Sequence, residues 1–319
     1  MKKKQKQQYH VRNWSEYNAA LVQRGSLTIW LDESALAGWI ERHRSGKRGA
    51  SRTYSEAAIQ AVLLLKAVYH LPLRGAQGFV GSVLSLMGLS WPVPHYSTLS
   101  RRQVGLELVM PRLRQGEAIH LVVDSTGCKV YGEGEWKVRV HGKSRRRTWR
   151  KLHLGVDENS GEIVAGVLSS NNVSDGEALP LLLEQIAEPL AQVSGDGGYD
   201  QRGCYEALQK RQEEQKQPLQ VTIPPRRGAR IWRHGNSKGQ KQKRDENLRA
   251  IRKVGRQRWK QESGYHRRSL AETAMSRYKR IVGDKLQARD FARQSTEAFV
   301  GVLMLNQMTA LGMPQSYPI

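Results

Sequence analysis

Three acidic side chains stand out because of where the sequence pattern places them. Asp124 follows the apolar run 118–123, which has the composition of a buried strand. Asp196 lies in a glycine-rich corner after another short strand-like segment, and Glu272 lies in a helical pattern beyond a strongly basic stretch. Because open sheets place functional groups just beyond strand ends, we expect the two aspartates to converge. Each aspartate alone also fits a plain turn or cap role.

The helical pattern around Glu272 aligns other polar residues with it. At 100° per residue, Tyr265, Arg268, Glu272 and Lys279 share a stripe about 60° wide. The apolar residues between 270 and 282 fall elsewhere on the circumference, so the helix should pack one face. An exposed amphipathic helix with an Arg268–Glu272 pair, contributing a few tenths of a kcal/mol, is one interpretation. The other is a carboxylate that meets a metal ion while its neighbours meet phosphates.

The charge of the chain indicates the class of partner. The 319 residues include 52 Lys and Arg against 29 Asp and Glu, a formal net charge of +23, which is typical of nucleic-acid-binding proteins. No apolar run approaches the ~18 residues of a membrane-spanning helix. The basic N-terminus has no apolar signal segment behind it, so we expect a cytoplasmic protein without a membrane partner. Cys128 and Cys204 are too few for a disulfide framework and need only packing roles.

Positive charge is most concentrated between residues 226 and 268. This stretch holds 16 Lys and Arg, beginning with Arg226 and Arg227, against three acids. Charge runs usually form solvated faces, but an imbalance this large favours contact with a polyanion. Trp232 and Trp259 lie within the stretch, where they could stack on bases, although packing is the commoner role of a tryptophan.

Residues 1–115 are expected to form a helical, DNA-binding domain. Apolar runs and boundary residues predict helices over 55–70, about 73–87 and from Ser97 onward, the last capped by Ser97. Arg101 and Arg102 fall near the start of the third helix, which resembles a helix-turn-helix reader with a long connection. A plain helical bundle with solvated arginines is the alternative.

Residues 116–319 are expected to form a mixed α/β domain with a basic insertion at about 226–260. The predicted order is strand 118–123, hairpin 151–156 and 162–168, helix 177–187, strand 192–194, helix 205–211, strand 219–223, and then the helix of Glu272. Asp157 and Asp175 fit turn and cap roles, and His120 and His153 fit ordinary core or surface imidazoles. Asp200 lies close enough to Asp196 in sequence to be mistaken for it.

The residues of the Glu272 helix carry a resemblance to a known family. Tyr265, Arg268, Glu272 and Lys279 match, without a gap, the Y-(2)-R-(3)-E-(6)-K signature of bacterial insertion-sequence transposases with a DDE triad. LVVDSTGCK around Asp124 and SGDGGYD around Asp196 resemble the two aspartate motifs of that family. The resemblance covers almost the whole chain and is closest to the fifth insertion-sequence family.

The resemblance implies a ribonuclease H-like catalytic domain that cleaves and joins DNA. Asp124, Asp196 and Glu272 would be catalytic and would bind two divalent ions, Mg²⁺ with Mn²⁺ as a substitute. Tyr265, Arg268 and Lys279 would hold DNA near the scissile phosphate. The partners would be the terminal inverted repeats and target DNA, bound by a homodimer in a bacterial nucleoid.

Two other functions fit a basic protein of this fold. One is a catalytically silent DNA-binding regulator derived from a transposase, and the other is a metal-dependent nuclease or resolvase that cuts but never joins. The complete set of three acids argues against the regulator. The separate N-terminal domain argues against a general nuclease, which would not need to recognise specific ends.

Overall fold

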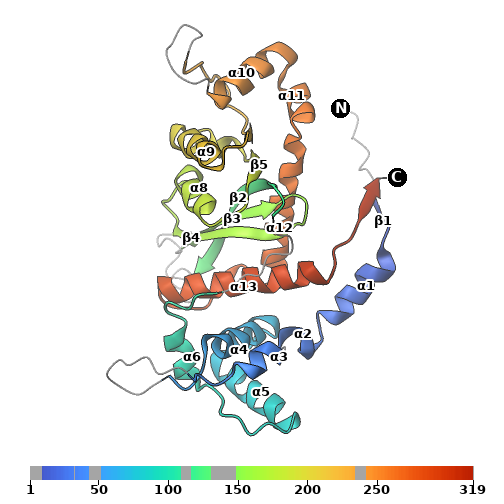
Figure 1. The fold of residues 1–319 in the computed structure, drawn as a ribbon, viewed down its shortest axis with the longest axis vertical. Coiled ribbons are helices and arrows are strands. Elements are labelled where there is room, and N and C mark those ends of the chain that lie inside the picture. The colour runs from blue at the N-terminus through green and yellow to red at the C-terminus, as the bar shows by residue number, and fades with distance from the viewer. Residues whose placement is uncertain are drawn as a thin grey trace, which may run out of the picture. The chain divides into compact units, whose positions relative to one another are not determined.

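The computed structural model describes residues 9–31, 33–42, 52–108, 116–130, 149–233 and 242–318. These residues form two compact units: one within Met1–Met110 and Val300–Ile319, the other within Pro111–Phe299 (Figure 1). The sequence analysis instead assigned the whole of 116–319 to one domain. The C-terminal residues group with the N-terminal ones because β8 (Ser316–Pro318) pairs antiparallel with β1 (Tyr9–Val11).

The first unit is mainly helical, as predicted. Its helices are α1 (Trp14–Gln23), α2 (Leu27–Trp30), α3 (Glu33–Ala37), α4 (Glu56–Val68), α5 (Leu73–Leu86) and α6 (Tyr96–Arg102), joined by the end of α13 (Phe291–Leu311). The Ser55 hydroxyl accepts a hydrogen bond from Ala58 N at 3.0 Å, which caps α4 where the sequence predicts its start.

No single helix among the described residues is long and apolar enough to cross a membrane. The pair α4 and α5 meets that test of length and composition only when taken together, and it is bent by 109° at the break between the two helices.

The third predicted helix begins earlier than expected. The cap of α6 is His95, whose ring nitrogen accepts a hydrogen bond from Ser97 N, so Ser97 is not the cap and both arginines fall in the last turn. Arg101 is exposed, whereas Arg102 Nη1 donates to the Tyr54 carbonyl at 2.9 Å. Arg101 is therefore more accessible from solvent than Arg102, and the helix-turn-helix interpretation of this unit stays a prediction.

The second unit is built on a six-stranded mixed sheet. Its strands are β2 (Ile119–Val130), β3 (Trp149–Asp157), β4 (Ile163–Ser170), β5 (Leu190–Ser194), β6 (Gln220–Thr222) and β7 (Lys285–Leu286). The order is β4-β3-β2-β5-β6, with β7 beside the end of β2. The β2–β3–β4 pairs are antiparallel, whereas β5 and β7 run parallel to β2 and β6 runs parallel to β5. The predicted mixed α/β architecture is confirmed.

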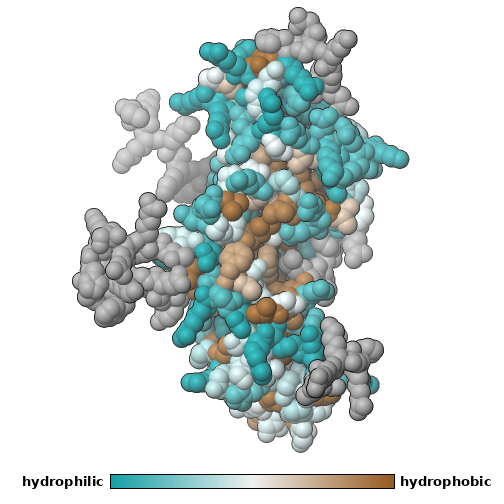
Figure 2. Space-filling model, turned by 90° about the vertical axis from the view of Figure 1, so that its left-hand side faces the viewer, coloured by the Kyte–Doolittle hydropathy of each residue, from teal (hydrophilic) through white to brown (hydrophobic). Residues whose placement is uncertain are grey.

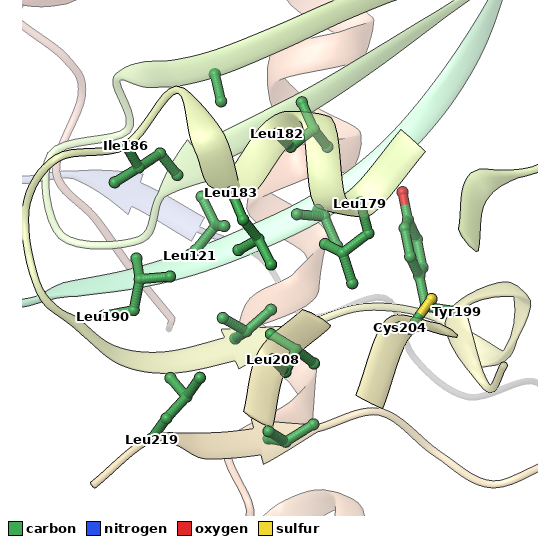
Figure 3. Close-up of a cluster of buried hydrophobic side chains, with 14 of the residues drawn as sticks. Leu121, Leu179, Leu182, Leu183, Ile186, Leu190, Tyr199, Cys204, Leu208 and Leu219 are labelled. Atoms are coloured by element: carbon green, nitrogen blue, oxygen red, sulfur yellow. The ribbon is translucent and has the colours of Figure 1, made fainter. Parts of the chain in front are cut away.

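Helices cover both faces of this sheet (Figure 1). Helices α8 (Asp175–Glu184) and α9 (Arg202–Gln215) cover one face of the sheet and enclose a hydrophobic core, to which Leu121 and Val123 of β2 contribute (Figure 3). Helix α12 (Ser269–Ile281) packs against β2 and β3. Since side chains alternate along a strand, Asp124 points away from the core of Leu121 and Val123, toward the side of α12.

The exterior agrees with the composition of the chain. On the face drawn in Figure 2, hydrophilic side chains predominate and hydrophobic ones form smaller groups between them. Two further helices, α10 (Lys243–Val254) and α11 (Arg256–Glu262), come from the basic stretch and bury few of their side chains.

The strand that carries Asp124 differs from its prediction. The sequence analysis ended it at residue 123, but β2 continues to Val130 because β3 pairs with it as far as Lys129. The residues beyond Asp124 are less apolar than those before it, and cross-strand partners rather than local composition hold them in the sheet.

We expect truncation of Leu182 to destabilise the second unit. Leu182 is fully buried in the core, whereas its neighbour Leu181 on the same helix is 48% exposed. Leu182→Ala should lower the free energy of unfolding by about 2–5 kcal/mol because it leaves a cavity. Leu181→Ala, the matched control, should change it by less than about 0.5 kcal/mol. Equal effects in urea titrations would contradict the assignment of this core.

Candidate active site

The parallel pairing of β2 and β5 brings the first two predicted aspartates together. Val122 pairs with Ser194 at the end of β5. Asp124 and Asp196 each follow two residues later, Asp124 within β2 and Asp196 in the turn that follows β5. Asp196 then caps the 3₁₀ turn η2 (Gly197–Tyr199) by accepting a hydrogen bond from Gly198 N at 2.7 Å. The expected convergence of the two aspartates is therefore present in the register of the sheet.

A glycine makes this close approach possible. A Cβ atom at Gly195 would lie 2.9 Å from the Tyr199 ring and 3.1 Å from the Val123 side chain. Such distances would force apart the end of β5, the turn η2 and the strand that carries Asp124. Gly195 thus has a packing role between the two aspartate segments.

Helix α12 brings the third acid to the same place. Ala271, Ala274, Met275 and Tyr278 are buried on one side of α12, which leaves Glu272 half-exposed on another. The observed helix starts later than the sequence pattern predicts, because Tyr265–Arg268 form a 3₁₀ turn, η3, ahead of α12. Tyr265 and Arg268 nevertheless lie on the same side as Glu272, as the contacts of Arg268 show.

Arg268 joins the first and third acids directly. Its Nη1 donates to Asp124 Oδ2 at 3.2 Å, and its Nη2 donates to Glu272 Oε1. The contact with Asp124 spans 144 residues of sequence and ties the start of α12 to the centre of the sheet. One guanidinium thereby partly balances two carboxylates.

An open cleft lies beside this pair of acids. Its walls combine carboxylates, hydroxyls and cations from β2 and α12: Asp124, Ser125, Thr126, Glu272, Met275, Ser276, Lys279 and Arg280. Lys279, the last residue of the signature, is exposed at this cleft together with Arg280. The cleft therefore offers acids for a metal ion and cations for a phosphate along a single groove.

The charges of the three acids influence one another. Burial raises the pKa of Asp124, and the nearby Asp196 and Glu272 raise it further, while the Ser125 amide and Arg268 oppose the rise. Burial also raises the pKa of Tyr265, which again lies close enough to sense Asp196 and Glu272. The three acids therefore lie close enough to repel one another, and a bound cation would relieve this repulsion.

The donor set fits a hard divalent cation. Carboxylate oxygens are the ligands that Mg²⁺ prefers, and the register and the Arg268 bridge connect all three acids. Among the described residues, no three His, Cys, Asp or Glu side chains lie close enough together to hold a metal ion in their present positions. Arg268 occupies the position between Asp124 and Glu272.

Asp200 is removed from the candidates by its contacts. It is buried and accepts hydrogen bonds from Arg244 Nε at 2.7 Å and from Arg226 N at 2.8 Å. Asp245, also buried, accepts from the backbone of Trp232 and Arg233. Asp200 thus holds the basic stretch to the turn η2, Asp245 closes a loop within that stretch, and neither residue lines the cleft.

The cations of the basic stretch differ in availability. Arg226 and Arg227 are exposed, and Arg226 Nε also donates to the Gly197 carbonyl at 3.4 Å, beside Asp196. Trp259 is buried, and Trp232 lies 3.9 Å beneath the Arg244 guanidinium. Packing, rather than base stacking, therefore accounts for both tryptophans.

The sequence analysis missed a second charged cluster, which consists of Asp175, Lys151 and His153. Asp175 was predicted to be a cap, but Ser174 caps α8 in a capping box with Glu177. Asp175 instead pairs with Lys151 at 2.9 Å and lies 3.5 Å from the ring of the buried His153. The Ser-x-x-Glu spacing of Ser174 and Glu177 is the sequence signal that could have identified Ser174, rather than Asp175, as the cap.

The minor predictions fit ordinary structural roles. The Asp157 carboxylate accepts hydrogen bonds from the turn residues Asn159 and Ser160. His120 and His153 each pair with a serine hydroxyl at 2.8 Å. Both cysteines are free and buried.

Comparisons with known proteins identify the family of the chain. A family model described as "Transposase DDE domain" matches residues 115–307, and a second model of that description matches residues 22–133. The chain therefore belongs to the DDE transposases, a class of enzymes that cleave and transfer DNA. One solved structure is similar over 95% of this chain and 77% of its own, with 8% identity and a TM-score of 0.39. Its title describes a cryo-EM structure of a piggyBac transposase synaptic complex with hairpin DNA. At that TM-score the likeness does not establish a shared fold.

We expect the stability of the second unit to fall in mild acid. The pKa of His120 and that of His153 are each lowered to about 4, mainly by burial, and the charge of Arg267 contributes to the shift at His120. The unfolded chain binds these protons near pH 6.5, so the free energy of unfolding should decrease as the pH falls from about 6.5 toward 4.

His153→Gln should weaken this pH dependence, whereas a substitution at the exposed His266 should preserve it. Urea unfolding of the wild type and both variants at several pH values measures the effect. A wild-type stability that stays constant over this range would show that the buried imidazoles are not held neutral.

Proposed function

We propose that this protein is an insertion-sequence transposase of the fifth family, which binds the inverted-repeat ends of its element and catalyses strand cleavage and strand transfer. The observation that carries the proposal is the grouping of Asp124, Asp196 and Glu272 through strand register and the Arg268 bridge. The complete signature of Tyr265, Arg268, Glu272 and Lys279, of which Glu272 and Lys279 line the cleft, supports the family assignment. The strand order and the antiparallel β3 support a ribonuclease H-like fold.

Each group at the site has a distinct task in this proposal. The carboxylates of Asp124, Asp196 and Glu272 would hold two Mg²⁺ ions, for which Mn²⁺ would substitute. When bound, these ions supply activation of the attacking oxygen and stabilisation of the leaving oxygen in an in-line displacement. Lys279 and Arg280 would bind the phosphate backbone along the cleft, and Tyr265 and Arg268 would orient it.

The partners follow from the same chemistry. Exposed cations such as Arg101, Arg226 and Arg227 would add contacts to phosphates outside the cleft, because each neutralised phosphate releases counterions. Joining two ends of an element requires two active sites, so we propose that the protein works as a homodimer on DNA. Its place of action would be the cytoplasm, on the bacterial nucleoid.

Strand-transfer assays on DNA that carries the inverted ends flanking the gene test this function. Asp124→Asn, Asp196→Asn and Glu272→Gln should each bind the ends within a few-fold of the wild type. The yield of cleaved and joined products should fall by more than about 100-fold in each variant. Loss of a residue that only supports a metal ligand typically costs about 10–100-fold, and these residues are proposed to be the ligands themselves. Neutralising one ligand removes charge and a donor oxygen without removing the DNA surface.

Glu262→Gln is the matched control. Glu262 is as exposed as Glu272 and also pairs with an arginine four residues before it, but it lies outside the cleft. Its product yield should equal that of the wild type. Full activity in any triad variant would remove that residue from the site, metal-dependent cleavage without joining would indicate a nuclease, and end binding without cleavage would indicate a regulator.

A further inference from the structure

Arg268, the arginine of the signature, is already engaged within the protein and does not extend freely into solvent as a side chain used only for DNA contact would. Arg268 donates to two carboxylates at once, those of Asp124 and Glu272. Its side chain is only 22% exposed, whereas that of Arg258, in the comparable Arg258–Glu262 pair on α11, is 70% exposed. Both arginines pair with a glutamate four residues later, but only Arg268 also reaches an acid on the sheet.

Neighbouring groups hold Arg268 in this position. It ends the turn η3, where the Tyr265 ring lies 5.8 Å from its guanidinium. The Lys260 ammonium lies 4.7 Å from the centre of the same ring, which packs beside the buried Trp259. The preceding residue, Arg267, forms an ion pair with Glu158 at the end of β3. The backbone of η3 is therefore fixed to the sheet and aims Arg268 at Asp124.

The oxygens that Arg268 occupies are those that a metal ion needs. Asp124 Oδ1 already accepts a hydrogen bond from Ser125 N at 2.8 Å, so Oδ2, which Arg268 holds, is its more available oxygen. Glu272 offers Oε1 to the same guanidinium. A divalent ion that binds both acids must therefore compete with Arg268 for them.

We propose that Arg268 is an internal counter-cation that holds Asp124 and Glu272 together and yields their oxygens to the divalent ion. This inference rests on the proposed function, since it takes the triad as the metal site. Once displaced, the guanidinium is free to meet a DNA phosphate, for which its planar fork is well suited. Metal binding would thereby release a DNA-binding group at the cleft.

Binding of Mn²⁺ to the full-length protein, followed by electron paramagnetic resonance of the free ion, tests the exchange. Arg268→Ala should bind Mn²⁺ about tenfold more tightly than the wild type, equivalent to about 1.4 kcal/mol, because the ion no longer has to displace the guanidinium from the two carboxylates. Arg268→Lys should fall between the two, since an ammonium cannot bridge both acids in the same way. Arg258→Ala should bind Mn²⁺ like the wild type.

Thermal unfolding provides a second readout. In EDTA, Arg268→Ala should melt at a lower temperature than Arg258→Ala, because the acids then repel without a cation, and saturating Mn²⁺ should raise its melting temperature more than that of the wild type. If Arg268→Ala is too unstable to handle, Arg268→Lys supplies the same comparison.

The results separate this inference from the proposed function. If Asp124→Asn abolishes Mn²⁺ binding while both Arg268 variants bind as the wild type does or more weakly, the exchange is refuted but the metal site stands. If the wild type shows no Mn²⁺ binding that depends on Asp124, both proposals fail. Tighter binding by the Arg268 variants together with loss of binding in Asp124→Asn supports both.

Discussion

Parallel pairing between β2 and β5 determines where the chemistry of this protein can occur. That pairing stops at Val122 and Ser194, and Asp124 and Asp196 each follow two residues beyond this last pair. The antiparallel partner β3 continues along β2, so Asp124 lies inside a long strand and is held on one side by the sheet. A rigid strand positions a carboxylate more accurately than a loop does, which would suit the metal-binding role proposed for Asp124.

The cost of this arrangement is repulsion among acids, and the surrounding charges offset it. Arg268 bridges Asp124 and Glu272, and Lys151 pairs with Asp175 behind them. A similar need exists in the basic stretch, where self-repulsion opposes folding. There the buried Arg244–Asp200 pair and the Asp245 carboxylate anchor the chain. A few buried acids thus stabilise the folded basic stretch by pairing with some of its groups. Its other cations stay available to a polyanion.

Local patterns in the sequence were sufficient to predict much of the fold and site. Alternating side chains over 151–156 and the turn residues 158–161 located the hairpin of β3 and β4, and helical periodicity located the face of α12 that carries Glu272. The spacing of Tyr265, Arg268, Glu272 and Lys279 led to the DDE transposase family, to which the chain belongs.

Interactions between distant residues could not be predicted in this way. The extension of β2 to Val130 depends on pairing with β3, and the Arg268–Asp124 contact joins residues 144 positions apart. The C-terminal strand β8 groups with the first unit through its pairing with β1. Periodicity assigns a residue to a face of its own element, but it does not specify which element lies opposite.

The central claim is that Asp124, Asp196 and Glu272 form one divalent-metal site. Anomalous X-ray diffraction from crystals of the protein–DNA complex grown with Mn²⁺ tests it most directly. The account predicts an anomalous peak within about 2.3 Å of carboxylate oxygens from both aspartates, with Glu272 completing the same cluster. Peaks at other residues, with no manganese at these carboxylates under saturating Mn²⁺, would contradict it.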